Sequence, residues 1–174
     1  IFILYILPIH FRWISKIEIF KIPIVGIIMR LNKYIPLERG NKESVDRMYS
    51  LAEKSLNEGI SIIIFPEGTR SEDGTLKKFK EGAFNLSKNT KKDILMVIID
   101  NAYRILPKNS IFFESWTEIK VRIIGEIPSI SEENFDYTIK KIEQLYRDEL
   151  AKMRGKKLKT PLTNSGVLGI LATT

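Results

Sequence analysis

The residues best suited to chemistry lie in one short segment, Phe65 to Ser71, which reads Phe-Pro-Glu-Gly-Thr-Arg-Ser. Arg70 can donate a forked pair of hydrogen bonds to a phosphate, and Glu67 can bind a hydroxyl group or hold that arginine in place. Gly68 permits a backbone geometry or a close approach that a side chain would block. These residue types predict an anion-binding loop. The alternative is an ordinary turn that carries a solvated ion pair.

The elements around this segment place it at the edge of a sheet. A nearly unbroken apolar run, Ile60 to Phe65, is typical of a strand covered on both faces, and open α/β sheets hold ligands where such strands end. Apolar patterning predicts further strands at 11–15, 34–37, 94–99 and 118–124, two short helices within 16–32, and helices at 44–57, 79–88 and 131–153. This alternation predicts an α/β layered domain with a largely parallel or mixed central sheet covered by helices.

Composition narrows the classes of protein and site. The 174 residues suffice for one domain, which we expect to span residues 1–159, followed by a loosely packed tail at 160–174. The absence of cysteine excludes disulfides, thiolate metal sites and cysteine nucleophiles, and with a single histidine, His10, we expect no metal. The formal charge of +7 favours partners that carry phosphate or anionic lipid, without choosing between nucleic acid and membrane.

The Phe65–Ser71 segment resembles, residue for residue, the third sequence block of the glycerophosphate acyltransferase family, which includes 1-acyl-sn-glycerol-3-phosphate (lysophosphatidic acid) acyltransferases. Residues 34–41 are similar to the second block, whose arginine helps to bind the glycerol phosphate of the acceptor, and residues 79–84 are similar to the Phe-Lys-x-Gly-Ala segment that follows. The resemblance implies a layered acyltransferase fold over approximately residues 1–125. It implies substrate-binding roles for Arg39, Glu67, Gly68, Thr69, Arg70 and Lys80.

The sequence departs from the pattern of this family in two places. The family's catalytic block is a histidine followed, five positions later, by an aspartate, whereas His10 is followed at that distance by Ser15. We therefore expect the catalytic pair to lie upstream of Ile1, no catalytic residue in this chain, and no turnover by the chain alone. The fourth block, at residues 94–99, has Met96 where the family usually has a proline.

The activity implied is transfer of a fatty acyl group from acyl-CoA or acyl-carrier protein to the free hydroxyl of 1-acyl-glycerol-3-phosphate. The product would be phosphatidic acid, and the reaction would belong to phospholipid biosynthesis. We expect no cofactor, because the acyl donor is a co-substrate. The expected partners are lysophosphatidic acid, the acyl donor and a membrane surface, and the expected location is the cytoplasmic face of a membrane. The apolar run at residues 1–9 is too short to span a bilayer.

Basic residues near the end of the chain suggest where the membrane would bind. They are Arg147, Lys152, Arg154, Lys156, Lys157 and Lys159. Such a cluster favours an anionic leaflet, or is simply a solvated helix end that stabilises its own dipole. One competing function is a nucleic-acid-binding basic domain, but we expect no specific nucleic acid as a partner, because the basic residues are not interleaved with exposed aromatic residues in a recognisable motif. The other is a non-catalytic phospholipid-binding domain.

Overall fold

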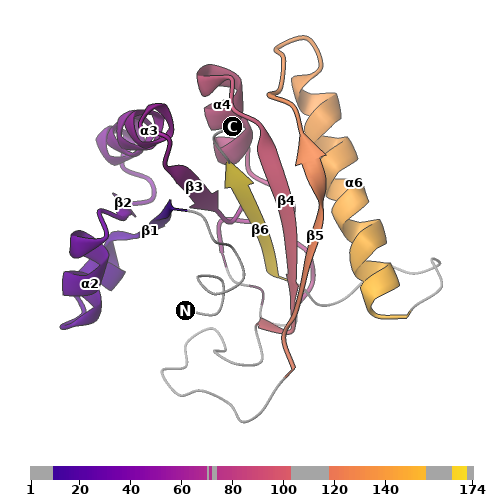
Figure 1. The fold of residues 1–174 in the computed structure, drawn as a ribbon, viewed down its shortest axis with the longest axis horizontal. Coiled ribbons are helices and arrows are strands. Elements are labelled where there is room, and N and C mark those ends of the chain that lie inside the picture. The colour runs from indigo at the N-terminus through magenta and orange to yellow at the C-terminus, as the bar shows by residue number, and fades with distance from the viewer. Residues whose placement is uncertain (1–9, 70, 72–73, 103–117, 156–165, 172–174) are drawn as a thin grey trace.

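A computed structural model describes residues 10–69, 71, 74–102, 118–155 and 166–171, and its centre is one mixed sheet (Figure 1). Across these residues the strand order in the sheet is β2-β1-β3-β6-β4-β5. Their bounds are β1 (Phe11–Lys16), β2 (Ile35–Leu37), β3 (Ser61–Ile64), β4 (Ile94–Asp100), β5 (Lys120–Ile127) and β6 (Gly166–Leu171). The helices are η1 (Ile17–Lys21), α2 (Val25–Leu31), α3 (Lys42–Asn57), α4 (Gly82–Thr90) and α6 (Phe135–Met153).

The sheet has a parallel part and an antiparallel part. Strand β1 pairs in parallel with both β2 and β3, whereas β6 runs antiparallel to β3 and β4, and β4 runs antiparallel to β5. The predicted α/β fold with a mixed sheet is therefore confirmed.

Both faces of the central strands β3 and β4 are buried, which explains their unbroken apolar runs. Along β4, Met96 and Ile98 face the main core with α3, α4 and α6, while Val97 and Ile99 belong to a second apolar cluster. Alternate residues of a strand point to opposite faces, so a strand covered on both sides needs apolar residues at every position. Because β4 pairs with neighbours on both of its edges, Met96 suits this strand better than a proline, which lacks an N–H group.

The end of the chain differs from its expected state. Residues 166–171 form β6, which lies between β3 and β4, so the prediction of a loosely packed tail is wrong for this part of 160–174. The sequence Gly-Val-Leu-Gly-Ile-Leu is too short and glycine-rich for its periodicity to identify a strand, and its pairing depends on partners far away in the chain. The remaining residues of that tail lie outside the described residues.

Two further differences concern the ends of elements. Strand β5 continues past Gly125, where the sequence suggested it would close, because a bulge opposite Met96 and Val97 absorbs one extra residue and allows pairing to resume. Helix α4 begins at Gly82 instead of residue 79, which leaves Phe79 and Lys80 in the preceding loop. Among the helices of the described residues, none has the length and apolar character needed to cross a membrane.

Candidate functional site

The two segments singled out by the sequence emerge at the same edge of the sheet. Strands β2 and β3 both run parallel to β1, so all three carboxyl ends lie at one edge. Arg39 follows the end of β2 by two residues, and the loop that begins at Phe65 follows the end of β3. Since β1 lies between β2 and β3 and pairs with both, these exits are about 10 Å apart, twice the usual spacing of neighbouring strands.

Arg39 sits in a turn held rigidly between β2 and α3. The Asn41 side chain caps α3 by accepting a hydrogen bond from Ser44 N (3.1 Å), and its amide group donates to Glu38 Oε2 (3.1 Å). Glu38 N in turn donates to the Ser44 hydroxyl (2.8 Å), while Gly40 takes a left-handed backbone (φ +81°). This network leaves the Arg39 side chain exposed beside the positive end of α3.

The loop after β3 is tied to the segment that precedes α4. Lys80 N donates to Pro66 O (2.8 Å), and Lys77 N donates to Glu67 Oε2 (2.8 Å). Gly68 has φ +66°, and a Cβ atom there would lie 3.0 Å from Lys80 Cδ, so the lysine side chain runs directly over the glycine. Glycine therefore suits this position for two reasons: its backbone has a positive φ, and a Cβ atom here would crowd the Lys80 side chain.

A carboxylate from the last helix holds the other end of this loop. Glu143 Oε2 accepts a hydrogen bond from Phe79 N (3.1 Å), and its Oε1 pairs with Arg147 (2.7 Å) one helical turn later. The sequence did not predict a role for Glu143. In sequence, Glu143 and Arg147 are indistinguishable from any solvated salt bridge between residues four apart on a helix. The role of Glu143 is visible only once α6 packs beside the loop.

Of the six predicted binding residues, the structure brings Gly68 and Lys80 into contact and places Arg39 at the same edge of the sheet. Glu67 is buried (4% exposed) and holds the loop. Thr69 lies half-buried beside Gly68. Arg70 lies outside the described residues, so its convergence with Arg39 stays a prediction. Arg39 and Lys80 are exposed, and in the described part of the chain neither pairs with a carboxylate.

His10 occupies the wrong edge of the sheet for catalysis at this site. It immediately precedes β1, and its carbonyl accepts a hydrogen bond from Ser61 N at the start of β3 (3.0 Å). The six residues of β1 separate it from the strand exits by about 20 Å. His10 therefore lies away from the proposed binding residues, and the absence of a catalytic residue from this chain stays a prediction. In the ranges that the structure describes, no three histidine or carboxylate residues gather as a metal site.

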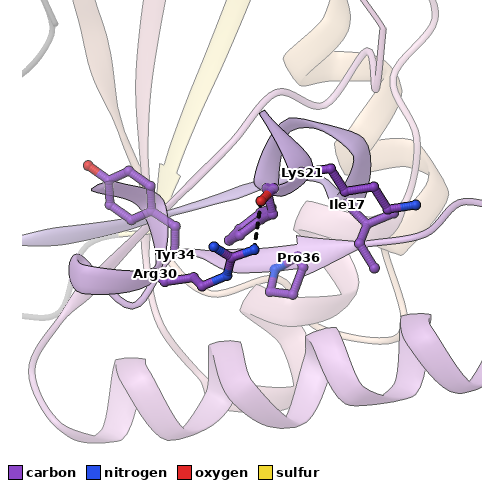
Figure 2. Close-up of a pocket in the computed structure, with 6 residues that line it drawn as sticks. Ile17, Lys21, Arg30, Tyr34 and Pro36 are labelled. Atoms are coloured by element: carbon purple, nitrogen blue, oxygen red, sulfur yellow. Dashed lines mark hydrogen bonds between the residues drawn. The ribbon is translucent and has the colours of Figure 1, made fainter. Parts of the chain in front are cut away.

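A cavity of about 470 Å³ lies near the same edge of the sheet (Figure 2). Its lining comes from the segment that joins β1 to β2 and from β2 itself: Ile17, Phe20, Lys21, Arg30, Tyr34 and Pro36. The Arg30 guanidinium donates to Phe20 O (2.8 Å), which joins α2 to η1. Partial burial raises the pKa of Tyr34, and a hydrogen bond with Trp13 offsets part of that shift. Two cations therefore line a largely apolar cavity.

Three of the basic residues predicted to meet a membrane pair with carboxylates of the protein itself. Arg147 pairs with Glu143, and Lys152 pairs with Glu149 (2.6 Å). The pKa of Glu149 is lowered, first by the hydrogen bond from Lys152 and further by Arg122. Arg154 forms a buried ion pair with Asp100 at the end of β4, with Nε 3.1 Å from both carboxylate oxygens. These three cations thus have carboxylate partners within the protein, although the Lys152 side chain stays 59% exposed. Membrane binding by this cluster stays a prediction, and lysines 156, 157 and 159 lie outside the described residues.

Comparisons with known proteins agree on one family. The Acyltransferase family model matches residues 1–107. The chloroplastic 1-acyl-sn-glycerol-3-phosphate acyltransferase LPAT1 of Arabidopsis thaliana is 37% identical over 100 residues, which cover 58% of this chain and 28% of that protein. The 1-acyl-sn-glycerol-3-phosphate acyltransferase of Borreliella burgdorferi is 30% identical over 140 residues, which cover 80% of this chain and 54% of that protein.

A solved structure agrees with these sequence relatives. The crystal structure of the 1-acyl-sn-glycerophosphate (LPA) acyltransferase PlsC from Thermotoga maritima superimposes with a TM-score of 0.69 at 26% identity. The match covers 86% of this chain and 59% of the PlsC chain. The present chain thus spans between about a quarter and about half of the length of the two curated relatives described above.

Proposed function

The chain belongs to the Acyltransferase family, and from this we propose that it forms the acceptor-binding part of an enzyme that acylates 1-acyl-glycerol-3-phosphate. The observation that carries the proposal is the loop after β3, whose Gly68 supports the Lys80 side chain at the edge where Arg39 also emerges. The relatives described above are named as acyltransferases of 1-acyl-sn-glycerol-3-phosphate or 1-acyl-sn-glycerophosphate, which agrees with such an acceptor.

The acceptor phosphate is the group that these residues suit. Arg39 and Lys80 are exposed cations without a carboxylate partner among the described residues, so no internal ion pair must break when an anion binds. Arg70, four residues after Pro66 in the same loop, is the third cation of the proposed cradle. Charge-assisted hydrogen bonds to phosphate are stronger than neutral ones, and an arginine offers a bidentate pair.

The chemistry is transfer of an acyl group to an alcohol. The free glycerol hydroxyl attacks the thioester carbonyl of acyl-CoA or acyl-carrier protein, an ester C–O bond forms, the C–S bond breaks, and the hydroxyl proton passes through a base to the leaving thiolate. Neither donor is favoured by any described residue. The described residues supply the anchor for this step, because His10 stands at the opposite edge of the sheet.

Direct binding measurements test the anchor. Titration of fluorescent lysophosphatidic acid below its micellar concentration, with the matching monoacylglycerol as a ligand without phosphate, should give binding of the phosphate ligand alone. Arg39→Ala should weaken that binding about fivefold to tenfold, since the cation is exposed and solvent screens part of its effect. The matched control is Arg47→Ala, an exposed arginine of α3 without a carboxylate partner in the described residues. Equal losses in both variants, or binding of the monoacylglycerol, would contradict the assignment.

A second candidate, a non-catalytic phospholipid-binding domain, is favoured by one observation. The only histidine in the sequence, His10, has no aspartate five positions on and lies at the opposite edge of the sheet from the proposed anchor. An assay with acyl-CoA or acyl-carrier protein and lysophosphatidic acid distinguishes the two functions. We expect no turnover by the chain alone, and turnover by a longer form that includes a histidine–aspartate block. A longer form that binds the acceptor without acylating it would favour the second candidate.

A further inference from the structure

Helix α2 and the residues before it expose a continuous apolar surface. Of the ten large hydrophobic side chains that are exposed in the described residues, six fall within residues 22–31. They are Ile22, Ile24, Val25, Ile27, Ile28 and Leu31, with exposed fractions from 41% to 76%, and we call them the α2 apolar surface. Soluble proteins scatter such residues singly, so a contiguous group indicates a binding surface.

The inner side of α2 packs closely against the rest of the protein. The exposure of its outer side is therefore not a consequence of loose packing. Met29 is buried, and Gly26 lies so close to η1 that a Cβ atom there would be 2.1 Å from Phe20 O. Arg30 adds its hydrogen bond to the same carbonyl. Ile24 has a left-handed backbone (φ 65°), which is unfavourable for a β-branched residue, and yet it is 71% exposed. Packing of the Ile24 side chain within the described fold therefore does not offset the cost of this backbone conformation.

Basic residues flank the α2 apolar surface in the sequence. Residues 16–33 contain four basic side chains and one acidic side chain, Glu18. The basic residues are Lys16, Lys21, Arg30 and Lys33, all exposed and, within the part of the chain that the structure describes, without a carboxylate partner. Lys21 and Arg30 also line the cavity of about 470 Å³ beside α2 (Figure 2).

This combination of charge and exposed apolar side chains favours one kind of binding partner for the α2 apolar surface. An apolar helix face flanked by lysine and arginine is the pattern that binds anionic membrane surfaces, because apolar side chains enter the interface while the cations meet headgroup phosphates. A second copy of the chain would bring these like charges together. We propose that the α2 apolar surface docks on a bilayer that contains anionic phospholipid, with Lys21 and Arg30 against its headgroup phosphates.

Docking here would bring the carboxyl end of β1 toward the bilayer, because η1 follows that strand directly. Residues 17–34, which include η1 and α2, connect β1 to β2, and α2 lies at the left of Figure 1, away from α6 at the right. The inference goes beyond the proposed function, since it concerns a different set of residues, and it is tested without acceptor or acyl donor.

Vesicle sedimentation tests the docking surface. The chain should bind vesicles of phosphatidylcholine mixed with phosphatidylglycerol and bind pure phosphatidylcholine at least about tenfold more weakly. Ile24→Ser combined with Ile27→Ser should weaken binding to the mixed vesicles by at least about tenfold, which is the apolar contribution of two partly inserted isoleucines. Ile123→Ser on β5, which is 53% exposed compared with 56% for Ile27, is the matched control and should bind as the parent chain does.

A second measurement gives a quenching signal that rises on docking, so a serine variant that merely misfolds cannot be mistaken for support of the proposal. Tryptophan fluorescence of an Ile27→Trp variant should be quenched by vesicles that contain brominated lipid, well beyond the quenching of the parent chain, while an Ile123→Trp variant should not exceed the parent. The proposal is wrong if the serine variants bind vesicles as the parent does or if both tryptophans are quenched equally. It is also wrong if the double serine variant abolishes a dimer in sedimentation velocity and leaves vesicle binding unchanged.

Discussion

Replacing Gly68 with alanine separates the backbone role of this glycine from its contact with Lys80. At φ +66° an alanine costs about 1 to 2 kcal/mol of stability, because its Cβ atom crowds the backbone in the left-handed region. The new Cβ would also lie 3.0 Å from Lys80 Cδ and 3.2 Å from Cε, so the lysine side chain must move by a few tenths of an ångström. We therefore expect a modest loss of stability together with a loss of affinity for lysophosphatidic acid of about threefold.

Gly59→Ala is the control for the backbone term. Gly59 has φ +78° in an open turn after α3, and no described atom lies within 4 Å of the position that a Cβ would take there. Alanine at this position therefore carries a similar strain without touching the site. Urea denaturation should show comparable losses of stability in the two variants, while binding titrations should show an affinity loss only for Gly68→Ala. In a Lys80→Ala background the affinity effect of Gly68→Ala should disappear. Its persistence there, or an equal effect of Gly59→Ala, would refute the reasoning.

Three further predictions concern stability. Gly26→Ala should lower the free energy of unfolding in urea by about 1 to 3 kcal/mol, because its Cβ atom would meet Phe20 O, and no change would contradict the packing of α2 on η1. Asp100→Asn should cost about 3 kcal/mol or more, since it leaves the charge of Arg154 buried beside a neutral amide. Burial raises the pKa of Tyr146, so the folded state keeps a proton that the unfolded chain loses above pH 10. The contribution of Tyr146 to stability should therefore fall by about 1.4 kcal/mol per pH unit above pH 10, and Tyr146→Phe should remove this part of the pH dependence.

Local patterning predicted most of the individual elements. The run after Ile60 became β3, the alternating residues from Phe11 became β1, and the amphipathic segment before Gly59 became α3. These predictions succeed because burial on one or both faces imposes a period that is readable within a few residues. The short strand β6 lacked such a period, and the start of α4 depends on the hydrogen bond from Lys80 N to Pro66 O, a tertiary contact.

The candidate site was predicted only in part. The motif around Gly68 and the placement of Arg39 after a strand could be derived from residue types and from the resemblance. The loop anchor Glu143 lies 64 residues from Phe79, and no local pattern indicates that pair. The same limit applied to the basic residues of α6, which looked free in sequence because their acidic partners were indistinguishable from solvated neighbours.

The sequence by itself determined the family, the order of strands and helices as far as α6, and the chemical character of the loop after β3, since each of these resides in neighbouring residues. Tertiary structure alone decided that β2 and β3 end at one edge, that Lys80 crosses over Gly68, and that the exposed apolar residues of α2 lie beside cations without carboxylate partners in the described residues. The physical reason is that strand pairing and burial join residues far apart in the chain, so which charges are neutralised emerges only on folding.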